Sequence, residues 1–171
     1  DGNFYYSDQS YNVINKIDAD GNLTIFAGTG EAGYSGDGGA ATSAKLYTPT
    51  GLAFDTNGNL YIADFRNHVI RKIDSNGNIS TFAGTGTEGL TGDGGAATSA
   101  TLNNPYDIVF DSNGNLYIAD QDNSRIRKVD TSGNISTFAG SAKGYAGDGG
   151  AATSAELDTP SGVAFDSNGN L

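Results

Sequence analysis

A nine-residue segment, GDGGAATSA, occurs three times in the chain, at residues 36–44, 92–100 and 147–155. The segment GNLYIAD stands at residues 58–64 and 114–120, with a diverged copy, GNFYYSD, at residues 2–8. The period is 56 residues, with one residue deleted in the third copy. Such self-similarity is the signature of a repeat architecture. We therefore assign residues 1–171 to a single repeat domain, with copies at 1–56, 57–112 and 113–167, and residues 168–171 beginning the next copy.

Each copy contains four strand-like runs in the same order. In the second copy they are TGLAFD, NLYIAD, HVIRKID and ISTFAG, at residues 50–55, 59–64, 68–74 and 79–84. Hairpin turns separate the runs, and a long connector leads to the next copy. Four antiparallel strands and one crossover per repeat are typical of a propeller blade, so we predict an all-β propeller. Alternation places Leu60 and Ile62 on one face and Tyr61 and Ala63 on the other, as expected for a sheet stacked between two neighbours.

The two ends of the chain look like halves of one blade. Residues 162–166, GVAFD, match a first strand, and Asn168-Gly169 predicts a type I′ hairpin turn. Residues 4–28 match the second, third and fourth strands. Propellers have about four to eight blades, so three blades do not close a ring. We predict a head-to-tail homodimer in which each chain completes the other's split blade, giving a six-bladed ring. The alternative is that the sequence is a piece of a longer chain.

The net charge is −11, from 20 acidic and 9 basic residues. A field of that sign repels phosphate backbones and anionic membrane surfaces, so we expect no nucleic-acid partner. No apolar run approaches the roughly 20 residues of a membrane span, which argues against membrane insertion. The chain contains no cysteine, which excludes disulfides and thiol chemistry.

The repeat resembles the NHL repeat, in the long form found in bacterial and archaeal surface proteins. The resemblance lies in GNLYIADFRNHVIRKID at residues 58–74, followed by FAGTG and GDGGAATSA, with the family motif at residues 67–69. The motif is weaker at residues 123–125 and departs at Tyr11. The resemblance implies six-bladed propellers that serve as protein-binding or RNA-binding modules, as sensor domains of kinases or, in a peptide-amidating lyase, as an enzyme. That lyase needs several metal-binding histidines, and this chain has only His68.

Two recurrent motifs suggest ligand sites but have simpler structural interpretations. The pattern D-x-[DN]-G-N resembles the opening of a calcium loop, yet a strand follows at once and the completing Glu is missing. We therefore interpret these segments as turns in which Asp bonds to its own backbone; they begin at Asp18, Asp55, Asp74, Asp111 and Asp166, with a looser relative at Asp130. The glycine-rich connector at residues 33–44 could cradle an anion, but its Asp37 would repel phosphate. We predict a crossover anchored by Leu46, Leu102 and Leu157.

A repeated polar set predicts a network that braces the blade. In the second copy it comprises Asp64, Asn67 and Arg71, and we expect Asp64 to cap the turn after the second strand through backbone amides. Whether Arg71 reaches Asp64 depends on strand facing, which the sequence leaves open. The third copy repeats the set as Asp120, Asn123 and Arg127, whereas the first holds Asp8, Tyr11 and Asn15.

Candidate ligand-binding residues are those at which the copies differ, because the fold constrains them less. Asp107 replaces a glycine in the first strand, which lines the channel of a propeller, so we expect its carboxylate near the channel mouth. The turn after the second strand reads QSYN, FRNH and QDNS in the three copies, which selects Phe65, Arg66, His68, Gln121 and Asp122. The connectors differ at Tyr34, Leu90 and Tyr145, which would either anchor a partner or pack the rim.

These features predict a non-enzymatic scaffold or binding module that presents its loops to a protein or a glycan. No nucleophile–base pair can be assembled from the sequence, and we expect no cofactor, catalytic residue or metal ligand. One alternative is a metal-dependent lyase or hydrolase whose channel mouth holds a divalent metal at Asp107. Another is an engineered or architectural half-propeller whose role is ring closure. Asn-x-Ser/Thr sequons at Asn22, Asn78 and Asn134 and the resemblance favour an extracellular or cell-surface location.

Overall fold

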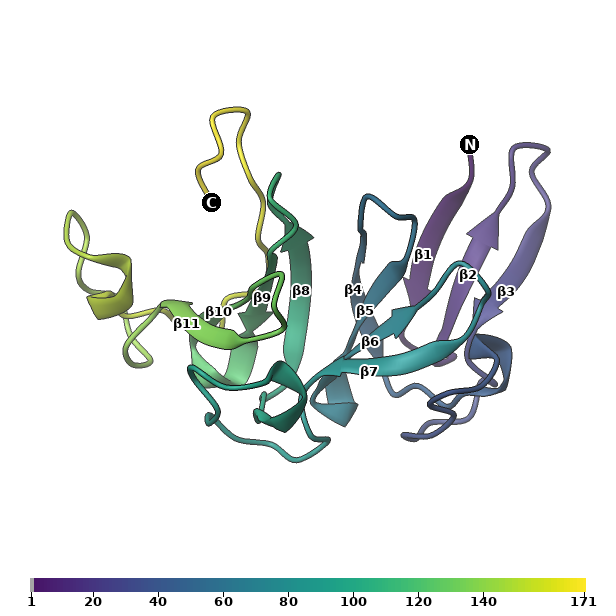
Figure 1. The fold of residues 1–171 in the computed structure, drawn as a ribbon, viewed down its shortest axis with the longest axis horizontal. Coiled ribbons are helices and arrows are strands. Elements are labelled where there is room, and N and C mark those ends of the chain that lie inside the picture. The colour runs from purple at the N-terminus through teal and green to yellow at the C-terminus, as the bar shows by residue number, and fades with distance from the viewer. Residues whose placement is uncertain (1) are drawn as a thin grey trace.

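The computed structural model describes residues 2–171 and contains three antiparallel β-sheets placed side by side in a row (Figure 1). Blade 1 has the strand order β1-β2-β3, blade 2 β4-β5-β6-β7, and blade 3 β8-β9-β10-β11. The strands are β1 Phe4–Asp8, β2 Val13–Ile17, β3 Leu23–Ala27, β4 Pro49–Phe54, β5 Leu60–Asp64, β6 Val69–Ile73, β7 Ile79–Ala83, β8 Pro105–Phe110, β9 Leu116–Asp120, β10 Arg125–Val129 and β11 Ile135–Ala139. Short 3₁₀ turns are η1 Ala41–Ser43, η2 Phe65–Asn67, η3 Ala97–Ser99, η4 Gln121–Asn123 and η5 Ala152–Ser154. The all-β prediction is confirmed, and blades 2 and 3 each contain the four predicted strands in the predicted order.

The hairpin turns differ in geometry from the prediction. Between β4 and β5, Gly58 has φ +81°, whereas Asn57 is not among the residues with positive φ. The Asp55 N–H donates to Asn59 O (3.0 Å), and the Gly58 N–H donates to Asp55 O (3.1 Å). This is a three-residue loop, in which a type I turn is followed by a left-handed glycine. The type I′ prediction is wrong because the extra loop residue leaves only one position that needs positive φ, and the same holds at Gly169 (φ +82°).

The aspartates of these loops bind backbone, as predicted. Asp74 Oδ1 accepts hydrogen bonds from the N–H groups of Asn76 and Asn78, both at 2.9 Å. The same pair of contacts recurs in the other five loops, which begin at Asp18, Asp55, Asp111, Asp130 and Asp166. The backbone N–H of Asn78 holds the pKa of Asp74 below its usual value. These carboxylates are therefore turn-forming groups.

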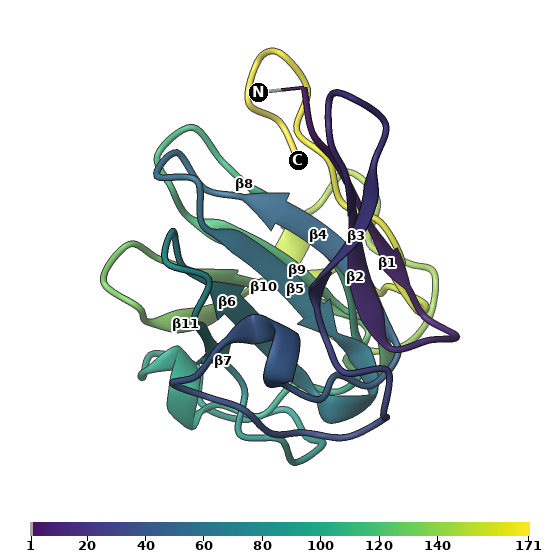
Figure 2. The same ribbon diagram turned by 90° about the vertical axis from the view of Figure 1, so that its right-hand side faces the viewer.

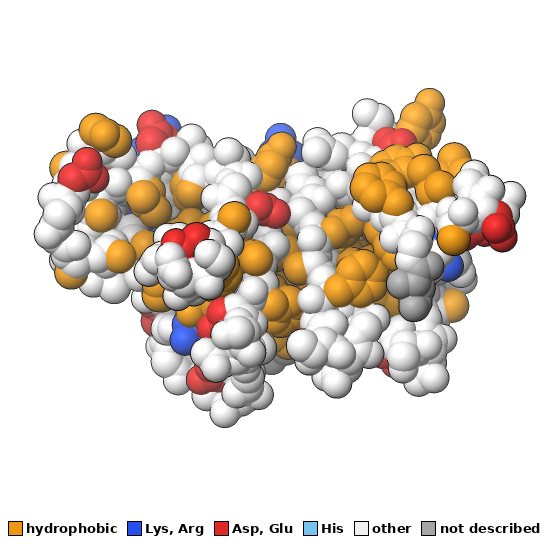
Figure 3. Space-filling view, turned by 90° about the horizontal axis from the view of Figure 1, so that it is seen from above, with side chains coloured by type: hydrophobic (Ala, Val, Ile, Leu, Met, Phe, Trp, Pro, Cys, Tyr) orange, Lys and Arg blue, Asp and Glu red, His pale blue; other side chains and the backbone are white. Residues whose placement is uncertain are grey.

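Both faces of blade 2, the inner blade of the row, are buried, which confirms the stacked arrangement for this blade. Leu60 and Ile62 lie in one apolar cluster with blade 1, while Tyr61 and Ala63 lie in a second cluster with blade 3. Burial of such side chains stabilises the fold by about 1.5–3 kcal/mol for each large residue. Apolar side chains gather between neighbouring blades when the molecule is viewed from above (Figure 3). Adjacent blades are thus held together mainly by apolar packing.

The first two connectors each pass from one blade over the outer strand of the next blade. In the first connector, the Gly38 N–H donates to Ile79 O (2.8 Å), and the Ile79 N–H donates back to Gly39 O (2.9 Å). The second connector makes the same two bonds between Gly94, Gly95 and Ile135. The anchoring leucines behave as predicted: Leu46 and Leu102 are fully buried, and Leu157 is half-buried in the blade 3 cluster.

The two ends of the row are open. Within residues 2–171, β1 is hydrogen-bonded to β2 alone, and blade 1 therefore has three strands where blades 2 and 3 have four. Residues 162–166, which we predicted as a strand, form no ladder, although their turn is formed by the Asp166 N–H···Asn170 O bond (2.9 Å). That prediction is wrong for the single chain because a first strand needs a neighbouring second strand. Figure 2 views the row from the β1–β3 end.

Candidate binding face

Phe65, Arg66 and His68, the binding residues predicted in the turn after β5, lie next to blade 3. They are on the side of the sheets that carries η2 and η4, which we call the turn face. The Phe65 ring packs edge-on against Tyr106, with centroids 5.7 Å apart. The exposed Arg66 guanidinium lies over the same Phe65 ring, at 5.1 Å. An arginine that stacks on an aromatic ring keeps its N–H groups free for a partner. Phe65 and Arg66 therefore form one surface together with Tyr106, which the sequence did not select.

His68 connects this surface to Asp122 through a hydrogen-bonded asparagine. His68 has left-handed backbone (φ 55°), and its Nδ1 accepts the N–H of Asn104 at 3.1 Å. Asn104 Nδ2 then donates to Asp122 Oδ2 at 2.6 Å. An Nδ1 that accepts a hydrogen bond must be unprotonated, so the proton sits on Nε2. We call Phe65, Arg66, His68, Asn104, Tyr106 and Asp122 the junction cluster.

The neutral state of His68 is favoured by its surroundings. Burial lowers the pKa of His68 below its usual value of 6.5, and Arg66 acts in the same direction, whereas Glu88 and Asp122 oppose it. A lowered folded pKa means that the unfolded chain binds the extra proton first as the pH falls. The contribution of His68 to stability is therefore complete above pH 6.5 and is lost as the pH falls through the lowered folded value.

We expect the stability of the native chain to fall more steeply below pH 6.5 than that of His68→Asn. Blade 1 holds asparagine at this position, where Asn12 Oδ1 accepts the Thr48 N–H at 2.9 Å. The variant keeps an acceptor and tolerates left-handed backbone, but it does not titrate. The measurement is the melting temperature of both proteins between pH 8 and pH 5. Parallel curves would contradict the role given to His68.

Gln121 contributes to its turn through the backbone. It opens η4 and is half-buried, and its carbonyl accepts the Ser124 N–H at 3.0 Å. Asp122, the next residue, is exposed and belongs to the junction cluster. Of the two binding residues predicted on this turn, only Asp122 is thus linked to the surface formed by Phe65 and Arg66, through the hydrogen bonds of Asn104.

Asp107, in β8, lies between β4 and residues 162–166. Its Oδ2 accepts the Val163 N–H at 3.0 Å, and its Oδ1 would lie only 2.6 Å from a Cβ added to Gly51. The carboxylate therefore occupies the close approach between β4, β8 and residues 162–166. Residues 2–171 contain no group of three or more His, Cys, Asp or Glu side chains arranged to hold a metal ion.

The three predicted connector residues have different surroundings. The Tyr34 hydroxyl is 2.6 Å from Thr81 Oγ1, and the Arg71 guanidinium lies 5.1 Å from its ring, so Tyr34 covers a buried charge. Leu90, at the same position in the next connector, is 42% exposed. Tyr145 is 90% exposed. Packing on the rim accounts for Tyr34 but not for Tyr145.

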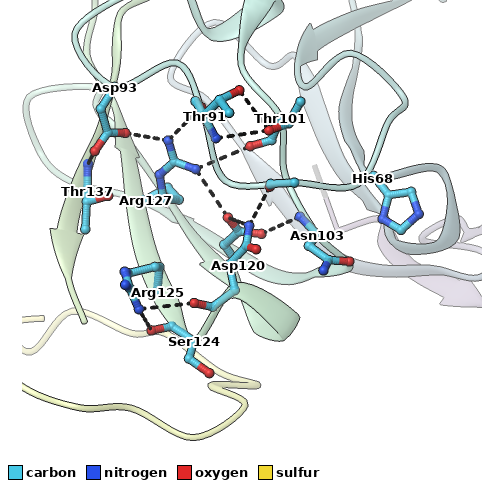
Figure 4. Close-up of polar contacts among 12 residues, drawn as sticks. His68, Thr91, Asp93, Thr101, Asn103, Asp120, Ser124, Arg125, Arg127 and Thr137 are labelled. Atoms are coloured by element: carbon cyan, nitrogen blue, oxygen red, sulfur yellow. Dashed lines mark hydrogen bonds and ion pairs between the residues drawn. The ribbon is translucent and has the colours of Figure 1, made fainter. Parts of the chain in front are cut away.

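Behind the turn face, a buried arginine ties each complete blade to its connector. In blade 2, Arg71 is fully buried; its Nη1 is 3.4 Å from Asp64 Oδ2, and its Nη2 is 2.5 Å from Asp37 Oδ1. Asp37 Oδ2 in turn accepts both the N–H (3.1 Å) and the hydroxyl (2.7 Å) of Thr81. In blade 3, Arg127 contacts Asp120 and Asp93 in the same way (Figure 4). The predicted brace is confirmed, and the connector aspartate is a partner that the sequence did not reveal.

The predicted cap at Asp64 is wrong for blades 2 and 3. Asp64 Oδ1 accepts the N–H of Tyr47, just before β4, because the connector delivers that donor to it (2.8 Å). In blade 1, Asp8 does accept the N–H of Tyr11 within the turn (3.1 Å). Burial raises the pKa of Asp64 to about 6, so its carboxylate is still ionised at neutral pH and balances Arg71.

The sequence of the chain matches the model of a known family. The family model described as the Teneurin NHL domain matches residues 1–91 and 85–146. The chain belongs to this NHL family. Among curated proteins, this NHL chain is similar to Teneurin-1 of Gallus gallus, with 34% identity over 140 residues, 75% of the chain and 5% of the relative. It is also 39% identical to NHL repeat-containing protein 2 of Gallus gallus over 95 residues, 54% of the chain and 13% of the relative. The NHL chain thus spans a small part of the length of these relatives.

Solved structures share the fold of this NHL chain. A protein of unknown function from Bacteroides thetaiotaomicron is 37% identical, with a TM-score of 0.65 over 74% of the chain and 32% of that structure. An auxiliary nutrient binding protein from the same organism has a TM-score of 0.71 at 17% identity, over 97% of the chain and 40% of that structure. A streptogramin B lyase aligns at 16% identity, over 80% of the chain and 37% of that structure, with a TM-score of 0.53. The last two likenesses show the fold alone, so the lyase does not assign an activity.

No helix within residues 2–171 is both long enough and apolar enough to cross a membrane.

Proposed function

We propose that this NHL domain is a non-enzymatic scaffold and binding module that closes a six-bladed ring with a second copy and binds a protein or glycan partner on its turn face. The observation that carries the proposal is the contrast between blades. Within residues 2–171, blades 2 and 3 each have a first strand, a covering connector and an arginine brace, whereas blade 1 has none of the three. Residues 162–166 have the sequence of the missing first strand and are themselves unpaired. In two copies arranged head to tail, residues 162–166 of each copy would supply the missing first strand of blade 1 in the other.

The junction cluster supports the turn face as the place of binding. It combines an exposed guanidinium, an aromatic pair and an exposed carboxylate within one surface. Arginine and aromatic residues are the side chains that most often anchor protein interfaces. In blade 1 the positions of Phe65, Arg66 and His68 are occupied by Gln9, Ser10 and Asn12. The cluster is therefore specific to the junction of blades 2 and 3. A ring of two copies would carry two such surfaces.

The test is binding to peptide and glycan arrays by the native chain and two variants. Arg66→Glu reverses the charge at the centre of the cluster, and we expect it to reduce the signal of bound array members at least tenfold. Asn113→Ser, an exposed change in a hairpin loop, is the matched control and should bind as the native chain does. Silence on both arrays, or equal binding by Arg66→Glu, would contradict the proposed binding face.

A further inference from the structure

Blade 1 carries an uncovered apolar groove on the face where blades 2 and 3 hold their connectors. The groove has a volume of about 320 Å³ and is lined mainly by Tyr6, Tyr11, Asn15, Leu23 and Ile25. Tyr11 is 71% exposed, Leu23 60% and Ile25 55%. Exposed apolar side chains gathered on one face are typical of an interaction surface. We therefore expect another segment of polypeptide to bind in this groove.

The internal repeats identify the kind of segment that fits. At the same place in blade 2, residues 33–41 of the connector cover Arg71 and Thr81 and form two backbone bonds with Ile79. Leu23 occupies the position of Ile79, and Ile25 that of Thr81. The cover that matches blade 1 is therefore a connector of the same sequence type.

The third connector is such a segment, and within residues 2–171 no blade lies beneath it. In residues 144–152, Tyr145 stands where Tyr34 stands in the first connector, and Gly149 stands where Gly38 does. Tyr145 is 90% exposed, against 42% for Tyr34, because no outer strand lies under it. The groove and the connector lie at opposite ends of the row, so a single chain does not bring them together (Figure 1).

We propose that the groove on blade 1 receives the connector 144–155 of a second copy, with Tyr145 as its anchor residue. This inference rests on the proposed ring and deepens it by naming the surface that decides closure. Gly149 and Gly150 would pair with Leu23 as Gly38 and Gly39 pair with Ile79. The Tyr145 ring would lie over Asn15 and Ile25.

The junction between copies is chemically different from those within a chain. The arginine that Asp37 and Asp93 bind is replaced in blade 1 by Asn15, so Asp148 of the incoming connector meets no cation there. Closure then depends on apolar and backbone contacts between two chains that each carry a net charge of −11. Because salt screens this repulsion, we expect dimerisation to strengthen as the salt concentration rises.

The experiment is sedimentation equilibrium of the full chain and its variants at 0.05 and 0.5 M NaCl. Tyr145→Ser should raise the dissociation constant of the dimer at least tenfold and leave the circular dichroism spectrum unchanged, because Tyr145 is exposed in the single chain. Leu90→Ser changes the same position of an intrachain connector, and it should leave the dissociation constant within threefold. Asn15→Arg restores a cation opposite Asp148 and should tighten the dimer severalfold.

The outcomes separate the inference from the proposed function. A native dimer that Tyr145→Ser weakens, but Leu90→Ser does not, supports the groove as the seat of the connector. A native dimer that Tyr145→Ser leaves unchanged would overturn the inference, while ring closure through residues 162–166 would stand. A native monomer at both salt concentrations would overturn ring closure, and the inference with it.

Discussion

Arg71→Met is expected to destabilise the chain by about 3–5 kcal/mol, because it leaves a buried carboxylate without its counter-charge. Arg71 is fully buried and is the only cation that contacts Asp64 within residues 2–171. The same substitution releases Asp37 and so loosens the connector from blade 2. In a chain of this size the loss corresponds to a fall in melting temperature of about 6–20 °C. Differential scanning calorimetry at pH 7 measures it.

Two variants control for this effect. Asn15→Met makes the same replacement at the equivalent position of blade 1, which has no charge to lose, and its effect should be below about 1 kcal/mol. Adding Asp64→Asn to Arg71→Met removes the stranded charge and should restore part of the stability. If Asn15→Met cost as much as Arg71→Met, the brace would have no special role.

Gly84→Ala is expected to destabilise the chain by about 2–5 kcal/mol, combining left-handed backbone strain of about 1–2 kcal/mol with overpacking of about 1–3 kcal/mol. Gly84 follows β7 with φ +93°, and an added Cβ would lie 2.5 Å from the carbonyl oxygen of His68. That oxygen belongs to the backbone directly before β6, and a backbone carbonyl cannot rotate away as a side chain can. Urea denaturation of the native chain and the variant measures the difference.

Gly58→Ala is the matched control for steric contact. Gly58 has a similar φ of +81°, but nothing lies within 4 Å of its added Cβ. It should therefore show the backbone strain alone, about 1–2 kcal/mol. Equal losses for Gly58→Ala and Gly84→Ala would show that the close approach of the strands is not what requires glycine at residue 84.

Local sequence patterns were sufficient to predict the blades. Alternation in LYIAD, with Leu60 and Tyr61 on opposite apolar faces, predicted a strand buried on both sides, and both residues are buried. The turn aspartates were also predictable, because their partners lie two and four residues away. Where the pattern failed, at the type I′ turns, the difference was one loop residue that composition does not reveal.

Contacts between residues of different repeats could not be predicted from the sequence. The spacing of Asp64 and Arg71 indicated a brace, but Asp37 lies 34 residues before Arg71, and only the path of the connector brings them together. The junction cluster has the same origin: His68 and Asp122 meet through Asn104, and no pattern around Asn104 marks it. The positions at which the copies differ led to the prediction of Phe65, Arg66, His68 and Asp122. Tyr106 was not predicted, although its counterpart in blade 2 is Thr50.

The central claim is that the open faces of this NHL domain are completed by a second copy, and the solution mass tests it most directly. Light scattering behind a size-exclusion column, in 0.5 M NaCl to screen the net charge of −11, measures that mass. The account predicts a single species with twice the chain mass of 17.5 kDa. A folded species of 17.5 kDa would contradict ring closure by two copies. A broad series of larger species would contradict it as well, because it would indicate head-to-tail chains that do not close.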